Sequence, residues 1–389
     1  MRGLVPAHIM TRIEDTTGLR MIDMVDIFTG PSTGAILNAG LNIPHPREPG
    51  RPRFRARHMV RFYEREGHKI FPADRFREFR AFIHDFNNRT MKIGQLNKLF
   101  RHGHYSPDHL SRSLKAMYGD FKLCDTLRSL VIPVYNIDGE QLRLAVEGDE
   151  GPDAPAPTKN NFRDDGGHAV WLKNIRGLKN NGCTVEVTLH DAVLASTAAP
   201  SYFPCHHFEA KFEGGKMRSY SGIDGSIFDN ACISYHGAIR QHVPEGNKVK
   251  MIVLGTGFTH RSFKKEDWNR FGGLGIVDPV NDLPLINILF HASESALLES
   301  FGNELGDDLF IFNRRLHAGQ DENPSSQIDD ATPENMARLR RFAEEMLEDN
   351  KSMFDNLCHT LVQNRDARQQ EQQEQSMLDR LRYFFAPRH

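Results

Sequence analysis

A serine flanked by two glycines occurs early in the chain, in the segment Gly30-Pro31-Ser32-Thr33-Gly34. This Gly-x-Ser-x-Gly pattern is typical of a nucleophile elbow, a sharp turn that exposes a serine hydroxyl above the edge of a sheet. Glycines are needed because side chains there would clash with the neighbouring strand and helix. The amide of Thr33 would then stabilise an oxyanion, helped by the helix dipole. The pattern alone leaves open whether Ser32 is a nucleophile or part of an ordinary turn.

The elements expected on either side of this turn favour the nucleophile. An apolar run predicts a buried strand at 25–28, and small and apolar residues predict the start of a helix at 35–41. Further strands are expected at 130–136 and 248–254, and helices at 7–19, 57–65, 74–86, 188–197 and 333–365. Strands separated by helices indicate an α/β layered sheet rather than an all-α or all-β domain.

A nucleophilic serine needs a base, and the candidate is the acidic residue of the Ile223-Asp224-Gly225-Ser226 stretch. Small residues around Asp224 allow its loop to approach another part of the backbone. Asp-Gly is also a favoured turn dipeptide, so the stretch by itself predicts only a turn. Its catalytic interpretation therefore depends on Ser32.

The composition argues against several classes of protein. The 49 basic and 51 acidic residues leave a net charge of −2, which is unfavourable for a dedicated nucleic-acid-binding protein. The chain has no run of 18 apolar residues and no basic-then-apolar signal segment at its start. The expected location is therefore cytoplasmic, with export that uses no cleaved signal left open.

The cysteines do not form a recognisable metal or disulfide pattern. They are odd in number, widely spaced and without a Cys-x-x-Cys pair: Cys124, Cys183, Cys205, Cys232 and Cys358. Neither a disulfide framework nor a structural zinc site is expected from this spacing.

Six segments in consistent order, from residue 2 to about residue 345, resemble the bacterial patatin-like phospholipase family. They correspond to the end of its glycine-rich first loop, its serine motif, a Phe-Tyr and Ile-Phe stretch, its Ala-Thr-Ser-Ala-Ala-Pro segment, its Asp-Gly motif and its Leu-Gly-Thr-Gly motif. In this chain they are Arg2–Ala7, Phe28–Gly34, Phe62–Phe71, Ala192–Pro204, Ile223–Ser226 and Ile252–Gly257.

The resemblance implies a three-layer α/β/α fold with a central, mostly parallel sheet. The catalytic domain would span residues 1–345, with the serine and aspartate motifs within 1–240. A helical C-terminal extension would span 346–389, with a Gln/Glu-rich linker at Gln369–Gln375 and a basic, aromatic tail. That tail could bring the protein into peripheral contact with an anionic membrane surface.

The resemblance also implies a serine–aspartate dyad that hydrolyses fatty-acyl esters of phospholipids or related glycerolipids through an acyl-enzyme. Ser32 would be the nucleophile and Asp224 the general base. Thr33 and Gly3 would contribute to the oxyanion hole, and the motif glycines would be Gly30, Gly34 and Gly225. No metal or other cofactor is expected, because the chemistry rests on the dyad and on backbone amides.

The chain departs from the family pattern at four places. It begins at Met1-Arg2-Gly3, without the preceding strand and glycines; either the true start lies upstream or these residues are lost, and as given the oxyanion hole is expected to be incomplete. After Asn230, Ala231 and Cys232 replace an asparagine and a proline. Pro31 replaces the usual threonine before the serine, and it restricts Gly30 toward extended conformations, which the end of a strand tolerates. Ser226 replaces a glycine or alanine, which is a small change.

Three alternative hypotheses follow from these residues. A Ser-His-Asp triad would use a histidine near the matched motifs: His190, His206, His207, His236 or His260. A catalytically impaired scaffold would keep the fold and bind lipid without turnover, as the missing first loop would favour. An acyltransferase would pass the acyl group from the enzyme to an alcohol instead of water.

Overall fold

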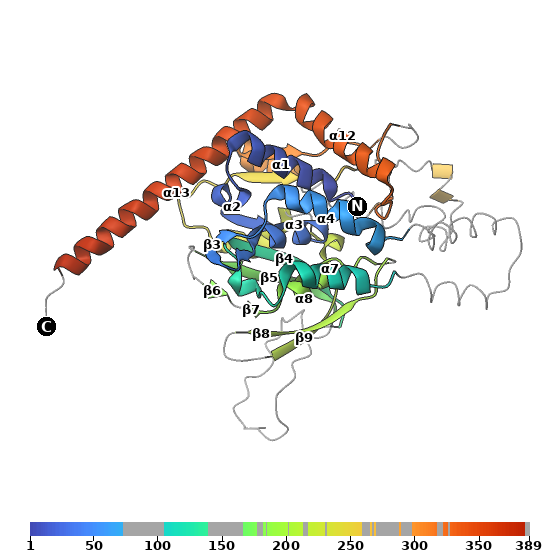
Figure 1. Cartoon of the computed structure of the whole chain (residues 1–389), viewed down its shortest axis with the longest axis horizontal. Helices are drawn as coiled ribbons and strands as arrows, with labels where there is room; N and C mark the ends of the chain where they lie inside the picture. The colour runs from blue at the N-terminus through green and yellow to red at the C-terminus, as the bar shows by residue number, and fades with distance from the viewer. Residues whose placement is uncertain are drawn as a thin grey trace, which may run out of the picture.

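The computed structural model describes residues 1–72, 105–138, 166–176, 182–183, 185–200, 202–212, 217–229, 232–258, 265–266, 268–269, 288, 298–316, 322–325 and 327–385, with side chains to residue 378. The helix predicted at 74–86 lies outside these residues. Figure 1 shows helices packed on both sides of a central sheet.

The predicted elements that fall on described residues lie close to their expected positions. The helices are α1 (Leu4–Thr17), α2 (Met21–Met24), α3 (Thr33–Asn42), α4 (Ala56–Ile70), α7 (Asp108–Tyr118), α8 (Leu189–Ser196), α9 (Cys232–Ser234), α12 (Pro333–Asp349) and α13 (Lys351–Phe385). The strands are β1 (Ile27–Thr29), β2 (Pro44–His45), β3 (Glu48–Pro52), β4 (Ser129–Asn136), β5 (His168–Ile175), β6 (Gly182–Cys183), β7 (Val185–Glu186), β8 (His206–Phe212), β9 (Met217–Asp224), β10 (Met251–Leu254) and β11 (Leu309–Phe312). However, β5, β8, β9 and α7 were not predicted, and the helix expected at 333–365 is divided into α12 and α13.

Capping residues explain where three of the helices begin or end. Helix α1 ends at Gly18, whose φ of 69° is left-handed and whose amide donates to the carbonyl of Glu14, as glycine allows. The Thr188 hydroxyl accepts the amide of Asp191 at the start of α8. Helix α12 begins in the same way at Thr332, with Pro333 in its first turn. These local signals are visible in the sequence.

The main sheet is mixed. Its strands lie in the order β6-β5-β4-β9-β8-β7, all antiparallel to their neighbours, and β1 pairs in parallel with β4. Strands β10 and β11 form a separate parallel pair. The three-layer α/β/α prediction is confirmed, but the expectation of a mostly parallel sheet is wrong. β8 and β9 are joined by a short connection of the kind that only antiparallel neighbours allow, and the parallel pairing of β1 with β4 is the exception in this sheet.

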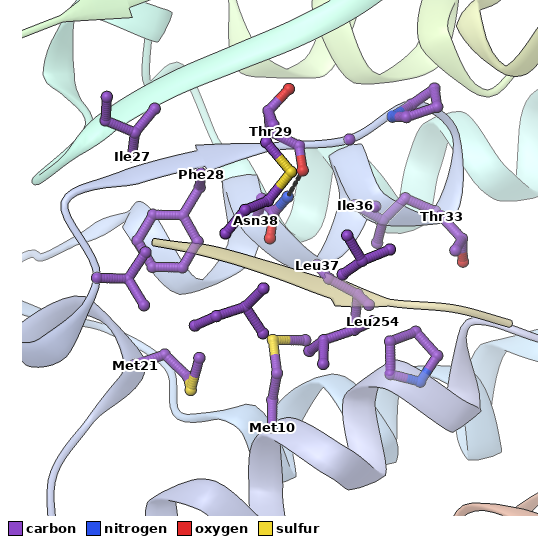
Figure 2. Close-up of a pocket in the computed structure, with 18 of the residues that line it drawn as sticks. Met10, Met21, Ile27, Phe28, Thr29, Thr33, Ile36, Leu37, Asn38 and Leu254 are labelled. Atoms are coloured by element: carbon purple, nitrogen blue, oxygen red, sulfur yellow. Dashed lines mark hydrogen bonds between the residues drawn. The ribbon is translucent and has the colours of Figure 1, made fainter. Parts of the chain in front are cut away.

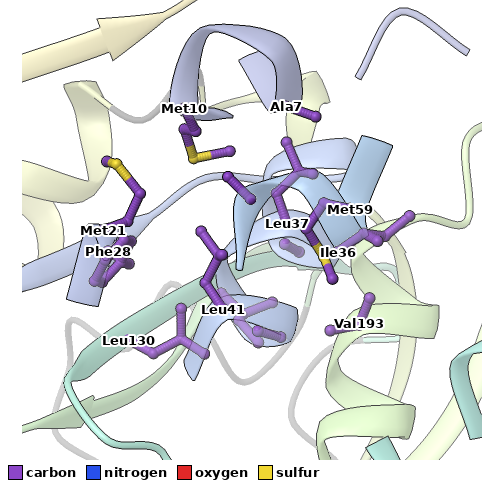
Figure 3. Packing of buried hydrophobic residues seen from close by; sticks show 14 of the residues in the cluster. Ala7, Met10, Met21, Phe28, Ile36, Leu37, Leu41, Met59, Leu130 and Val193 are labelled. Atoms are coloured by element: carbon purple, nitrogen blue, oxygen red, sulfur yellow. The ribbon is translucent and has the colours of Figure 1, made fainter. Parts of the chain in front are cut away.

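Side chains of β4 alternate between two hydrophobic cores, one on each face of the sheet. Leu130, Ile132 and Val134 belong to the larger core, which α1, α3, α4 and α8 complete. Val131 points to the opposite face and belongs to a smaller core around Phe301. Figure 3 shows part of the larger core, in which Leu41 of α3 lies beside Leu130 and the α1 residues Ala7 and Met10 lie farther from it. This period-two alternation is what a strand covered on both faces requires.

One disulfide joins Cys124 and Cys183, with a Cα–Cα distance of 5.3 Å. The odd number and wide spacing of the cysteines did not predict it, because the pairing depends on how β6 meets the 3-10 turn before β4. A bond that closes a loop across 59 sequence positions restricts the unfolded chain.

Reduction of this disulfide is expected to lower the free energy of unfolding by about 2–4 kcal/mol. Urea denaturation of the wild type with and without reductant measures the effect. The Cys183→Ser variant is the control, because reductant should leave its midpoint unchanged. An identical midpoint for oxidised and reduced wild type would show that the bond does not form.

The C-terminal part is helical beyond the predicted linker. Helix α13 includes the Gln369–Gln375 stretch, and Figure 1 shows it passing over the body and continuing beyond it. Arg368 and Asn364 bind Asp26 near β1, whereas Met377 and Leu378 are exposed. The domain boundary expected at residue 345 falls within α12 and remains a prediction. Of the helices described, none has the length and apolar composition needed to cross a bilayer.

Candidate active site

Ser32 and Asp224 come together because two strands meet end to end along one edge of β4. β5 occupies one edge of β4. On the other edge, β1 pairs in parallel up to Val131, and β9 pairs antiparallel from Asn136 down to Val134. The ends of β1 and β9 therefore face each other beside residues 132 and 133. Ser32 follows β1, and Asp224 is the last residue of β9.

The turn after β1 has an unusual backbone conformation. Ser32 has φ 52° and ψ −119°, and no other non-glycine residue described has a positive φ. Such a conformation costs about 1–3 kcal/mol and persists only where the surrounding structure maintains it. Gly30 has φ 156°, and a Cβ there would come within 3.3 Å of Gly34. The local backbone therefore matches the strained strand-to-helix turn expected from the sequence.

The carboxyl group of Asp224 is buried and interacts with both Ser226 and Ser32. The residue is only 4% exposed. The Ser226 amide donates to its Oδ1 at 2.8 Å, and the Ser32 side chain lies near enough to affect its pKa. Burial raises the pKa of Asp224 to about 6, although the interactions with Ser226 and Ser32 act in the opposite direction. Its ability to accept a proton near neutral pH is thereby increased over that of an ordinary aspartate.

Gly225 needs its small size for this arrangement. A Cβ at this position would lie 2.4 Å from the carbonyl oxygen of Pro133 in β4. The close approach brings the turn after β9 against the central strand, and so carries Asp224 toward the end of β1.

The start of the chain forms the other wall of the site. A Cβ on Gly3 would lie 1.9 Å from the Thr33 hydroxyl and 2.4 Å from that of Tyr63, so only glycine fits between them. The Thr33 and Tyr63 hydroxyls are hydrogen-bonded to each other. Arg2 extends to the carbonyl of Gly257, just beyond β10. Gly3 therefore lies beside Thr33.

A cavity of about 1590 Å³ contains both Ser32 and Asp224 and extends beneath β1. Figure 2 shows its apolar part, where Met10, Met21 and Phe28 lie near Leu37 and Leu254. Asn38 fixes the nearby wall by donating to the carbonyl of Thr29 at 2.9 Å. The cavity is thus lined both by the serine and carboxylate and by a group of hydrophobic side chains.

Histidines are absent from the described residues that line this cavity. His190 and His206 instead bind Asp191, His207 approaches Ser221, and His236 pairs with Glu304. His260 lies outside the described residues. Asp224 therefore lines the same cavity as Ser32, whereas none of the four described candidate histidines does.

Two residues of the site were missed by sequence reasoning. Tyr63 binds Thr33, and burial raises the pKa of its phenol, which keeps it neutral. Ser196 lies at the end of α8, where its hydroxyl and carbonyl oxygens accept the amide of Ser32. Both residues stand within segments that resemble the family, but nothing in their spacing indicates these contacts.

The described part of the chain contains no cluster of three or more His, Cys, Asp or Glu side chains arranged to hold a metal ion.

The fold and site define an α/β protein with a candidate serine nucleophile at a strand-to-helix turn, next to a buried carboxyl group. Comparison with known proteins extends this description. A family model described as "Patatin-like phospholipase" matches residues 1–235, more than half of the chain. The chain therefore belongs to the patatin-like phospholipase family, and this membership supports lipid acyl hydrolase activity in general terms.

Several plant proteins are similar over most of their length. Patatin-like protein 2 of Arabidopsis thaliana is 26% identical over 380 residues, covering 89% of this chain and 80% of the relative. Patatin-like protein 2 of Oryza sativa subsp. indica is 24% identical, covering 91% and 83%. Patatin-16 of Solanum tuberosum is 21% identical, covering 89% and 81%. These low identities leave the details of mechanism and substrate to be argued from the site.

Proposed function

We propose that the protein releases fatty acids from phospholipids or related glycerolipids, using Ser32 as nucleophile and Asp224 as general base. The contact between the Ser32 side chain and the buried Asp224 carboxyl group is the observation that carries this proposal. A neighbouring base is what an ordinary serine hydroxyl requires to become a nucleophile.

The reaction proceeds in two halves. Asp224 takes the proton of Ser32 while Oγ attacks the acyl carbonyl, and the resulting tetrahedral intermediate expels the lipid alcohol, which receives that proton. Water then attacks the acyl-enzyme, giving its proton to Asp224. The second tetrahedral intermediate releases the fatty acid, and the proton returns to Ser32. Every proton taken by the carboxylate is thus given back within one turnover.

The oxyanion of each intermediate needs hydrogen-bond donors. We infer that the backbone amides of Thr33 and Gly3 supply them, since the two residues adjoin each other beside Ser32. Each lies at the N-terminal end of a helix, α3 or α1, where the helix dipole also favours negative charge. Removal of one such donor typically lowers kcat by about 10²–10³-fold.

The apolar part of the cavity supports a long-chain acyl substrate. Methionine, phenylalanine and leucine side chains gather there, as Figure 2 shows, whereas charged residues such as Asp26, Arg128 and Lys250 line other parts of the cavity. Burial of each methylene group contributes about 0.8 kcal/mol, so long acyl chains gain more binding energy than short ones. A peripheral membrane contact through the end of α13 fits this substrate class, because Met377 and Leu378 are exposed there.

A fluorophosphonate probe tests the proposed chemistry directly. We expect the probe to label the wild-type protein at Ser32, located by mass spectrometry of the labelled peptide, and the label to be absent from Ser32→Ala. Labelling at another serine would contradict the assignment. No labelling under conditions that label a known esterase would instead favour a lipid-binding scaffold.

Product analysis separates hydrolysis from transfer. With a phospholipid substrate and a lysolipid acceptor, free fatty acid as the main product is expected from hydrolysis. A diacyl product made from the acceptor would show that the protein is an acyltransferase.

A further inference from the structure

We infer that Ser196 is a positioning residue, whose buried hydroxyl holds the backbone of Ser32 in the conformation needed for attack. This inference rests on the proposed function of Ser32, but the contacts that carry it lie outside the dyad. Ser196 is the last residue of α8 and is fully buried.

Hydrogen bonds within the turn do not include the Ser32 amide. The carbonyl groups of Pro31 and Ser32 accept the amides of Gly34 at 2.8 Å and Ile36 at 3.2 Å, both within the turn and the start of α3. The Ser32 amide points away from this turn and donates to both the carbonyl oxygen and Oγ of Ser196, each at 3.1 Å. The strained residue is thus anchored from another element, far away in sequence.

The direction of the Ser196 hydroxyl is itself determined. It donates its single hydrogen to the carbonyl of Pro133 at 2.6 Å, so only its lone pairs remain to face the Ser32 amide. Pro133 is one of the two residues of β4 left between the ends of β1 and β9. Its carbonyl is therefore available on the edge where the two strands meet.

The same turn of the chain also holds the other member of the dyad. Two residues after Ser196, the carbonyl of Ala198 accepts the amide of Asp224 at 3.0 Å. Ser196 and Ala198 therefore connect the backbones of Ser32 and Asp224 through one short segment. A small displacement of this segment would change the distance between the hydroxyl and the carboxylate, on which proton transfer depends.

Two variants of Ser196 test the inference on a soluble, short-chain ester. Ser196→Ala is expected to lower kcat by about tenfold with KM within twofold, because it affects the attack rather than ground-state binding. The rate of labelling by a fluorophosphonate should fall by the same factor. Ser196→Thr keeps the hydroxyl and is expected to restore most of kcat.

The control is Thr126→Val, which removes another fully buried hydroxyl bonded to backbone carbonyls, outside the cavity. It should lower the melting temperature without changing kcat. Equal kcat values for Ser196→Ala and the wild type would overturn the inference. An equal loss of kcat in Thr126→Val would do the same, because the effect would then be one of general stability.

Hydrogen exchange at the Ser32 amide provides a readout that does not need activity. We expect faster exchange in Ser196→Ala than in the wild type and in Thr126→Val. If the wild-type protein is neither labelled by the probe nor able to hydrolyse esters, the proposed function is wrong, but hydrogen exchange still tests the Ser196–Ser32 hydrogen bond. If exchange at the Ser32 amide is the same in Ser196→Ala as in the wild type, the proposed role of the Ser196 hydroxyl is wrong, whatever the activity.

Discussion

Ser32→Ala is expected to lower kcat/KM for the release of fatty acid from phospholipid by at least about a thousandfold. We expect the Ser32 hydroxyl to form the acyl-enzyme, because it lies beside Asp224 on the strained turn that follows β1. Binding should remain, because the apolar cavity walls are unchanged. The rate is measured by counting the radiolabelled fatty acid released over time from phospholipid vesicles. The affinity is measured by the binding of a non-hydrolysable ether lipid.

The matched control for this variant is Ser113→Ala on α7, which removes a hydroxyl that bonds to Glu66 outside the cavity. Its activity should stay within twofold of the wild type. Substantial hydrolysis by Ser32→Ala would remove the nucleophile from the mechanism. A loss of similar size in a variant of His190, His206, His207 or His236 would instead support a histidine-containing triad.

Asp224→Asn is expected to separate activity from stability. Asparagine can still accept the Ser226 amide, but it cannot take a proton from Ser32, so kcat should fall by about 10²–10⁴-fold. In the wild type, kcat/KM should rise with pH through about 6, where burial places the pKa of Asp224. The residual activity of the variant should lack this rise.

Whereas Asp224→Asn should lower activity, it should increase the stability of the folded protein relative to the wild type as pH rises. Because the pKa of Asp224 is raised in the folded state, the unfolded chain releases this proton at lower pH than the folded protein does. The wild type therefore loses stability from this group as pH rises from about 4 to about 6. Asparagine does not titrate and has no such loss. The unfolding free energy of Asp224→Asn should therefore increase relative to that of the wild type by about 2–3 kcal/mol over that pH range.

Urea denaturation of both proteins at pH 4.5 and 7.5, followed by tryptophan fluorescence, measures this difference. A constant difference at the two pH values would show that the pKa of Asp224 is ordinary. A normal rate for Asp224→Asn would exclude the carboxylate as the base. The two outcomes are independent, since the first concerns burial and the second concerns proton transfer.

The sequence by itself determined the local parts of this protein. The Gly30–Gly34 pattern indicated the sharp turn, and the structure gives Ser32 the positive φ that such a turn requires. The helices expected at 7–19 and 188–197 correspond to α1 and α8, whose ends depend on capping by a few neighbouring residues. The ordered motifs also indicated the patatin-like phospholipase family.

Only the tertiary structure decided how these parts meet. The sequence does not encode strand pairing locally, so the shared edge of β4 and the mixed sheet could not be predicted. The Cys124–Cys183 bond and the contact of Ser196 with Ser32 also join residues far apart in the chain. The raised pKa of Asp224 depends on its burial, which arises only when β9 packs against β4 and α8. These properties come from long-range packing, for which no short stretch of residues carries a signal.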